Sequence, residues 1–201
     1  MTKSKDHNNF TRGHGLLEPL LSKLRARRAN QLIPSQLRNG RILDIGCGSY
    51  PYFLSHTSFA DKFSVEQNNP AQEPEGINWI VLDLNKEPKL PFEDNYFDVI
   101  TLLAVIEHLN PKMLVFLFRE ILRTLKPGGI LILTTPANWT RGLLSAMTFF
   151  NLVSKEEIQE HVFTYTLPLL GWYFGTAGFQ MENIRFGNFE FFMNLWCTAK
   201  K

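Results

Sequence analysis

One stretch of this sequence reads Arg41-Ile42-Leu43-Asp44-Ile45-Gly46-Cys47-Gly48-Ser49-Tyr50-Pro51. Its first half is an apolar run typical of a buried strand, and an acid and a pair of glycines come at the end of that run. Glycine lets a backbone pass close to a nucleotide-like ligand, because it has no Cβ and accepts positive φ. We therefore expect a strand that runs into a ligand-binding loop.

Three further acids follow apolar runs at regular intervals along the chain. Glu66, Asp83 and Glu107 each stand at or just past the carboxyl end of such a run. In an open α/β sheet, ligands bind outside the carboxyl ends of the strands. Together with Asp44, the pattern predicts that four strand ends converge on one site.

Strand and helix patterns alternate from Gly40 onward, which predicts a parallel sheet with right-handed crossovers. The clearest helix follows the N-cap residue Asn110 and has Pro111 at its first position. Its predicted buried face comprises Leu114, Leu117, Phe118, Ile121, Leu122 and Leu125, and residues 126–129 end it. The apolar run 130–135 is then predicted as a strand covered on both faces.

The end of the chain breaks this alternation. Residues 179–186 and 189–199 are two strand-like runs, and Gly187-Asn188 between them is a hairpin turn signal. We therefore predict an antiparallel pair that closes one edge of the sheet.

Length and charge favour a single domain without an obvious polyanionic partner. The chain has 201 residues, enough for one full core, and a formal net charge of +2. The charge is uneven, because residues 1–40 hold eight Lys and Arg against Asp6 and Glu18, whereas the remainder holds thirteen against seventeen acids. A charge this small does not by itself indicate nucleic-acid binding.

The cysteine count and the apolar runs favour a soluble cytoplasmic protein. Cys47 and Cys197 lie far apart and form neither a metal-type pair nor a disulfide framework. The polar amino terminus lacks the apolar stretch of a secretory signal, and no later apolar run reaches about 18 residues. We read Cys47 as a small residue fitting a tight loop and Cys197 as packing on the last strand.

A basic helix is predicted near the amino terminus. Leucines at positions 16, 17, 20, 21 and 24 form a helical stripe, with Lys23, Arg25, Arg27 and Arg28 on its polar side. Residues 16–28 suit peripheral contact with a membrane or with an anionic substrate. The alternative is a solvated face on a helix that caps the domain, which is what charge runs usually mean.

At these residues the chain resembles the class I S-adenosylmethionine-dependent methyltransferases, in particular the broad group related to ubiquinone and menaquinone biosynthesis methyltransferases. The likeness covers about residues 38–200. It rests on five pieces in order: residues 43–48, Val65-Glu66, residues 82–84, residues 90–100 continuing to Glu107-His108-Leu109, and residues 125–129. The resemblance implies a doubly wound, mostly parallel, seven-stranded sheet with a C-terminal antiparallel hairpin, a Rossmann-like fold.

The resemblance also implies which residues hold the cofactor, S-adenosyl-L-methionine, whose product is S-adenosyl-L-homocysteine. The implied contacts are Asp44, Gly46, Cys47, Gly48, Glu66, Gln67, Asp83, Leu84 and Leu103. Glu66 would accept both ribose hydroxyls, Asp83 the adenine amino group, and Asp44 would order the glycine loop and its ammonium contacts. A mildly negative pocket suits a ligand that carries a sulfonium and an ammonium.

The sequence departs from the family in two places. Tyr50 and Pro51 stand where relatives usually have a third glycine, so the turn should be stiffer. Some relatives bind a divalent metal through Glu-x-x-Glu-His, but here Ala104 replaces the first ligand. Glu107 and His108 alone make a poor metal site, so we expect no metal.

The acceptor side is less specific. His108 is a candidate general base, with structural packing as the alternative, and His161 is a second catalytic candidate. We divide the chain into a tail and basic helix at 1–37 and a methyltransferase domain at 38–201, with 137–175 as a substrate-side cap. That cap is strongly aromatic, which fits an apolar or aromatic acceptor or simply a packed core. The aromatic residues are Trp139, Phe149, Phe150, Phe163, Tyr165, Trp172 and Tyr173.

We expect an enzyme that moves a methyl group from S-adenosylmethionine to a small molecule by in-line displacement. One alternative is a nicotinamide-dependent oxidoreductase, which the Tyr50-Pro51 pair disfavours because the dinucleotide fingerprint needs a later Gly or Ala. Another is a non-catalytic partner subunit that keeps the fold. Nucleic acid is disfavoured as acceptor because Asn-Pro-Pro-Tyr and a Pro-Cys nucleophile are absent, although the basic helix leaves it open.

Overall fold

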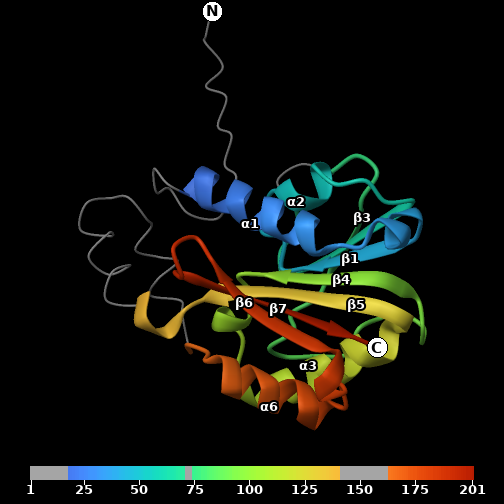
Figure 1. Ribbon diagram of the computed structural model, residues 1–201. Coiled ribbons are helices and arrows are strands. Elements are labelled where there is room, and N and C mark those ends of the chain that lie inside the picture. The colour runs from blue at the N-terminus through green and yellow to red at the C-terminus, as the bar shows by residue number, and fades with distance from the viewer. Residues whose placement is uncertain (1–17, 71–73, 141–162) are drawn as a thin grey trace, which may run out of the picture.

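A computed structural model describes residues 18–70, 74–140 and 163–201, and Figure 1 shows them as one sheet between two layers of helices. Within these residues the sheet has seven strands in the order β3-β2-β1-β4-β5-β7-β6. The strands are β1 (Arg41–Ile45), β2 (Asp61–Glu66), β3 (Asn78–Val81), β4 (Phe97–Leu103), β5 (Leu125–Pro136), β6 (Ile184–Phe189) and β7 (Asn194–Lys200). β7 runs antiparallel to both β5 and β6, and the other pairings are parallel, so the predicted fold is confirmed.

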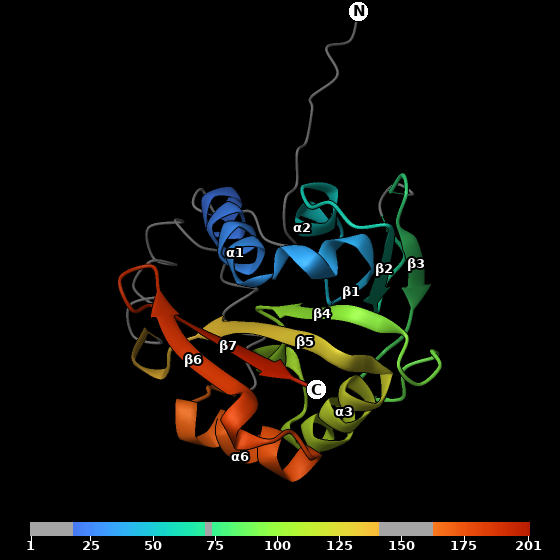
Figure 2. The same cartoon turned by 45° about the vertical axis from the view of Figure 1, so that its right-hand side comes forward.

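The α-helices lie on the two faces of this sheet (Figures 1 and 2). They are α1 (Glu18–Leu32), α2 (Tyr52–Ser55), α3 (Pro111–Thr124) and α6 (Leu167–Ala177). Short 3₁₀ turns join them to strands: η1 (Ser35–Asn39), η2 (Ile106–His108), η3 (Asn138–Thr140) and η4 (Met181–Asn183). α1 and α2 cover one face, and α3 and α6 cover the other.

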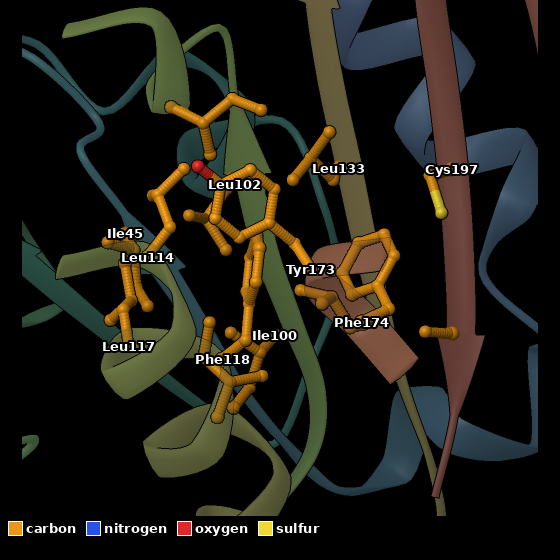
Figure 3. Close-up of a cluster of buried hydrophobic side chains, with 14 of the residues drawn as sticks. Ile45, Ile100, Leu102, Leu114, Leu117, Phe118, Leu133, Tyr173, Phe174 and Cys197 are labelled. Atoms are coloured by element: carbon orange, nitrogen blue, oxygen red, sulfur yellow. The ribbon is translucent and has the colours of Figure 1, made fainter. Parts of the chain in front are cut away.

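Side chains of β1, β4 and β5 alternate between two cores. The larger core lies under α3 and α6, where Phe118 and Phe174 meet Ile45 and Leu133, as Figure 3 shows. Cys197 of β7 is buried in this core, as predicted. The opposite face packs under α1. Because Ile45 faces α3, its neighbour Asp44 faces α1, and this places the acid beside the crevice described below.

The helix predicted after Asn110 is confirmed. The Asn110 side chain accepts a hydrogen bond from the Lys112 backbone N–H at 3.1 Å, and Pro111 occupies the first turn. The helix ends at Thr124, so Leu125, predicted on its buried face, is instead the first residue of β5. β5 therefore begins five residues earlier than the predicted strand at 130–135.

The terminal hairpin is confirmed, but its turn lies elsewhere than predicted. Gly187 and Asn188 are inside β6, where Gly187 pairs with Trp196 of β7. A Cβ at position 187 would lie 2.4 Å from the Trp196 ring. The glycine therefore makes room for an indole across the ladder rather than forming a turn.

The turn itself is built from residues that a sequence pattern does not flag. Glu190, Phe191 and Phe192 have φ values of 52°, 53° and 67°, a region that L-residues seldom occupy. The Met193 N–H closes the turn on the Glu190 carbonyl at 3.0 Å. Three successive left-handed residues without a glycine explain why the turn was not predicted.

The helix predicted near the amino terminus is present, but its buried face differs from the predicted leucine stripe. Residues 16 and 17 lie outside the described part of the chain, and Leu20 is 52% exposed. Ala26 and Ala29 make the buried contact, because their small side chains let the helix lie close to β4 and β5. The helix packs on the same sheet as the rest, and the boundary at residue 37 stays a prediction.

Replacing Gly187 with alanine should lower the free energy of unfolding by about 1–3 kcal/mol, because the added methyl group would overlap the rigid indole of Trp196. Thermal or urea unfolding measures this. Gly175→Ala is the matched control: its Cβ would lie 3.6 Å from the Met181 sulfur, an ordinary contact, and alanine is favoured over glycine in a helix. Equal stability of the two variants would contradict the packing role.

Candidate active site

A crevice of about 490 Å³ opens where β1, β2 and β4 end. The sheet order changes direction here, because the chain builds outward from β1 to β3 on one side and from β4 to β6 on the other. Such a switch point is where open α/β sheets bind ligands, and the volume is within the range of small-molecule sites.

All nine residues predicted to hold the cofactor line this crevice. They are Asp44, Gly46, Cys47, Gly48, Glu66, Gln67, Asp83, Leu84 and Leu103, and His108 lines it as well. The sequence did not indicate that α1 also contributes, through Ser22, Arg25 and Ala26. The sequence leaves open whether the basic side of this helix meets a ligand or solvent, and only the tertiary packing shows that Arg25 reaches the crevice.

The two glycines of the loop have different reasons to be glycine. Both have positive φ, 76° at Gly46 and 72° at Gly48. A Cβ on Gly46 would lie 2.6 Å from the Val105 side chain, so this position is fixed by packing. A Cβ on Gly48 would meet nothing within 4 Å, so here the backbone faces open space in the crevice. Gly48 is thus the position at which a ligand can approach the main chain.

Glu66 ties the glycine loop to the end of β2. Its carboxylate accepts one hydrogen bond from the Gly48 N–H and another from the Gln67 N–H, both at 2.9 Å. The side chain is buried. Charge-assisted bonds to backbone amides offset much of the cost of removing the carboxylate from water, and an ionised carboxylate has about four acceptor sites in all.

Asp44 is the second buried carboxylate in the crevice. Burial raises its pKa to about 7, the Thr101 hydroxyl lowers it by donating a hydrogen bond at 2.6 Å, and the negative charge of Glu66 raises it further. The local register explains the contact, because Asp44 of β1 lies directly opposite Thr101 of β4. The pair of acids therefore favours a positively charged ligand, which would relieve their repulsion.

Asp83 stands at the rim of the crevice rather than inside it. Its carboxylate contacts the Lys86 ammonium at 3.0 Å and accepts a hydrogen bond from the Asn85 N–H, also at 3.0 Å. The hydrogen bond from Lys86 is the main cause that lowers the pKa of Asp83. It thus carries its charge at neutral pH and is more accessible to solvent than Asp44 or Glu66.

Cys47 has the environment of a packed residue, not of a nucleophile. Its sulfur lies 2.8 Å from the Ser64 hydroxyl. Burial, and then the charge of Asp44, raise the pKa of the thiol well above its usual range. The thiolate needed for covalent chemistry is therefore disfavoured.

The convergence of four acids was predicted, but Glu107 does not line the crevice. Ala104 adopts a φ of 58° after β4, and η2 then carries Glu107 into the interior, where it accepts a hydrogen bond from the Thr135 hydroxyl at 3.1 Å. His108, the next residue, faces the crevice instead. Within residues 18–70, 74–140 and 163–201, no three His, Cys, Asp or Glu side chains gather as metal ligands would.

The aromatic acceptor region divides between core and surface. Tyr165 and Tyr173 are buried in the larger core, whereas Trp172 and Trp139 are mostly exposed, and Trp139 does not line the crevice. His161, Phe149 and Phe150 lie outside the described residues. The described ends of segment 137–175 therefore supply packing, and its role as a cap stays a prediction.

No helix in the described ranges is long and apolar enough to cross a membrane.

Comparison with known proteins adds a family and a set of relatives. Residues 16–184 match the model of a family described as "Methyltransferase domain". Over 115 residues, 50% of this chain, the sequence is 29% identical to 33% of the tRNA N(3)-cytidine methyltransferase METTL2 of Danio rerio. Over 108 residues, 46% of this chain, it is 30% identical to 38% of the uncharacterized methyltransferase C1B3.06c of Schizosaccharomyces pombe. The aligned part thus spans between 33% and 38% of the length of these curated relatives.

Solved structures show the same fold at low identity. A SAM-dependent methyltransferase from Archaeoglobus fulgidus has a TM-score of 0.67 at 18% identity, with 89% of this chain and 94% of that chain covered. A putative methyltransferase in complex with the Trm112 activator from Haloferax volcanii has a TM-score of 0.65 at 15% identity, with 87% and 88% covered. The finer likeness to ubiquinone and menaquinone enzymes stays a prediction. By its family match the chain belongs to the methyltransferase-domain family, and it has the fold of S-adenosylmethionine-dependent methyltransferases of known structure.

Proposed function

We propose that the crevice holds S-adenosylmethionine through the nine residues predicted from the sequence, and that the chain methylates a small-molecule acceptor. The observation that carries the proposal is the pair of buried carboxylates, Asp44 and Glu66, which line the same crevice as the open backbone at Gly48. A cationic, hydroxyl-rich ligand suits a crevice of about 490 Å³ that is lined by buried acids and by the glycine loop.

The adenosyl half of the cofactor suits the β2 and β3 ends. Glu66 is already oriented by the Gly48 and Gln67 amides, so its oxygens can accept ribose hydroxyls without reorganisation. Asp83 at the rim, followed by the buried Leu84, suits the adenine ring, with a carboxylate for the amino group and an apolar surface for the ring.

The methionine half suits the β1 end. Asp44 supplies negative charge for the ammonium, and Thr101 holds that carboxylate in place from the neighbouring strand. When bound, the cofactor supplies a methyl group on a sulfonium, a leaving group that departs as a neutral thioether. The protein's task is therefore to align the acceptor, exclude water and remove a proton where the nucleophile carries one.

The acceptor side supports a compact substrate. Ser22, Arg25 and Ala26 of α1 line the crevice together with His108 and Leu109, and its volume of about 490 Å³ suits a small molecule better than a duplex or a folded RNA. The position of His108 in the lining of the crevice supports it as the candidate general base. His161 stays a second catalytic candidate on sequence grounds alone.

Glu66→Ala should weaken binding of S-adenosylhomocysteine by roughly 100-fold or more, because a buried carboxylate that accepts charge-assisted hydrogen bonds is lost. Calorimetry with S-adenosylhomocysteine, and with NAD as the competing dinucleotide, measures this. Glu182→Ala, an exposed acid on η4, is the control and should bind like the natural protein. Unchanged affinity in a folded Glu66→Ala protein, or binding of NAD instead, would contradict the cofactor site.

Affinity for S-adenosylhomocysteine should fall as the pH is lowered from 7 to 5. The pKa of Asp44 is about 7 without ligand, so the acid is protonated below that value, and the ammonium group of the ligand can pair with it only after that proton is lost. The loss should approach tenfold per pH unit and should be absent in Asp44→Asn. Calorimetry across this pH range measures it; an equal slope in the variant would assign the titration to another group.

The same substitution has a second readout, on stability. Because folding raises the pKa of Asp44 above its ordinary value of 3.8, the folded protein binds more protons than the unfolded chain between about pH 4 and 7. The contribution of this group to stability therefore decreases as the pH rises through that window. Asp44→Asn without ligand should melt higher than the natural protein at pH 8, although it binds the cofactor more weakly.

His108→Asn should lower kcat by roughly 100-fold or more if the acceptor must lose a proton, with the affinity for S-adenosylhomocysteine unchanged. The discriminating measurement is the pH profile of kcat, whose acidic limb should disappear in the variant. Transfer of labelled methyl groups to a low-molecular-weight extract, compared with total tRNA, supplies the assay. A profile that keeps its acidic limb would leave His108 with a packing role only.

A further inference from the structure

The turn between β6 and β7 presents two phenylalanines to solvent. Phe191 is 92% exposed and Phe192 is 67% exposed. Both lie in the left-handed run that begins at Glu190, a conformation that a glycine or asparagine would adopt at lower cost. Two large apolar side chains are therefore exposed to solvent at a position where small polar residues would form the turn at lower cost.

The polar groups around this turn point inward. The Asn194 side chain donates to the Glu190 carboxylate, and burial raises the pKa of Glu190. The Trp139 indole N–H donates to the Phe192 carbonyl at 3.1 Å, which ties η3 to the turn and leaves the Trp139 ring 59% exposed. The exposed surface of the turn is thus aromatic, whereas the carboxylate of Glu190 is partly buried.

The basic helix lies beside this turn. Arg25 of α1 is close enough to lower the pKa of Glu190, and the Arg28 guanidinium lies 4.8 Å from the centre of the Trp196 ring on β7. Figures 1 and 2 both place the β6–β7 turn at the same end of the molecule as the first turns of α1. Three further side chains of α1, Leu20, Lys23 and Arg27, are exposed.

We propose that these side chains form one docking surface for an anionic lipid bilayer. The hairpin surface, as we call it, consists of Leu20, Lys23, Arg27, Trp139, Phe191 and Phe192. Phenylalanine and leucine enter the boundary between headgroups and acyl chains, tryptophan lies at that boundary, and lysine and arginine contact lipid phosphates. Apolar residues beside cations are the composition that such an interface requires.

The shape of the surface favours a bilayer over RNA. Unpaired bases stack in grooves or on sheet faces that present rings side by side. Here the rings project from the end of a hairpin, with an aliphatic leucine nearby, and a deformable lipid surface accommodates such a projection. Because α1 also lines the crevice, through Ser22 and Arg25, docking would bring the crevice close to the lipid interface.

Vesicle sedimentation of the full chain tests the apolar half of this proposal. The protein should bind mixed phosphatidylcholine–phosphatidylglycerol vesicles, and the double variant Phe191→Asn/Phe192→Asn should bind at least about tenfold less. Asparagine tolerates the left-handed backbone, so the variant keeps its turn. Phe116→Asn removes a phenylalanine that is 55% exposed on α3, and this matched control should bind normally.

A charge-reversed pair tests the electrostatic half. Lys23→Glu/Arg27→Glu should bind at least about tenfold less and should lose most of the salt dependence, whereas Lys112→Glu/Arg119→Glu on the exposed side of α3 should not. The hairpin variants should retain their affinity for S-adenosylhomocysteine, so this test stands apart from the methyl-transfer assignment. Absence of binding to anionic vesicles, equal loss in the α3 controls, or phenylalanine-dependent binding of total tRNA in place of vesicles would overturn the proposal.

Discussion

The architecture of the site depends on one constraint: two carboxylates are kept out of water at the ends of adjacent strands. Burial of a charge is costly unless hydrogen bonds compensate it, and the two acids are compensated by different groups. Glu66 is compensated by the Gly48 and Gln67 amides, whereas Asp44 has the Thr101 hydroxyl and a raised pKa. In the proposed site the acids are therefore oriented before any ligand binds, because the cost of orienting them is met by folding.

This constraint also explains the local sequence. The Gly48 amide reaches Glu66 only because the loop after β1 turns back with positive φ at Gly46 and Gly48. The packing of Val105 against Gly46 then joins this loop to the one after β4. The loop that carries Gly48 is thus in direct contact with Glu66 at the end of β2 and with Val105 after β4.

The sequence predicted those parts of the fold and site that depend on neighbouring residues. Apolar runs followed by Asp44 or Glu66, and the cap at Asn110, are local patterns with one physical solution. The errors come from contacts between distant segments: Gly187 is glycine because of Trp196, and α1 packs through Ala26 and Ala29 rather than its leucines. Glu107 lies in the interior and not in the crevice, and it follows Ala104, which has a positive φ. An alanine gives no sequence signal for that backbone conformation.

The leucines and arginines of α1 lie outside the fully buried contact of this helix with the sheet. Because α1 buries alanines against the sheet, its larger apolar residues are less buried, and Leu20 is exposed. Leu20 belongs to the first turn of α1, at the end of the molecule where the β6–β7 turn lies. Arg25 has one side toward the crevice and another toward Glu190 below the exposed phenylalanines. One helix therefore forms a wall of the proposed cofactor pocket and a part of the proposed lipid-facing surface.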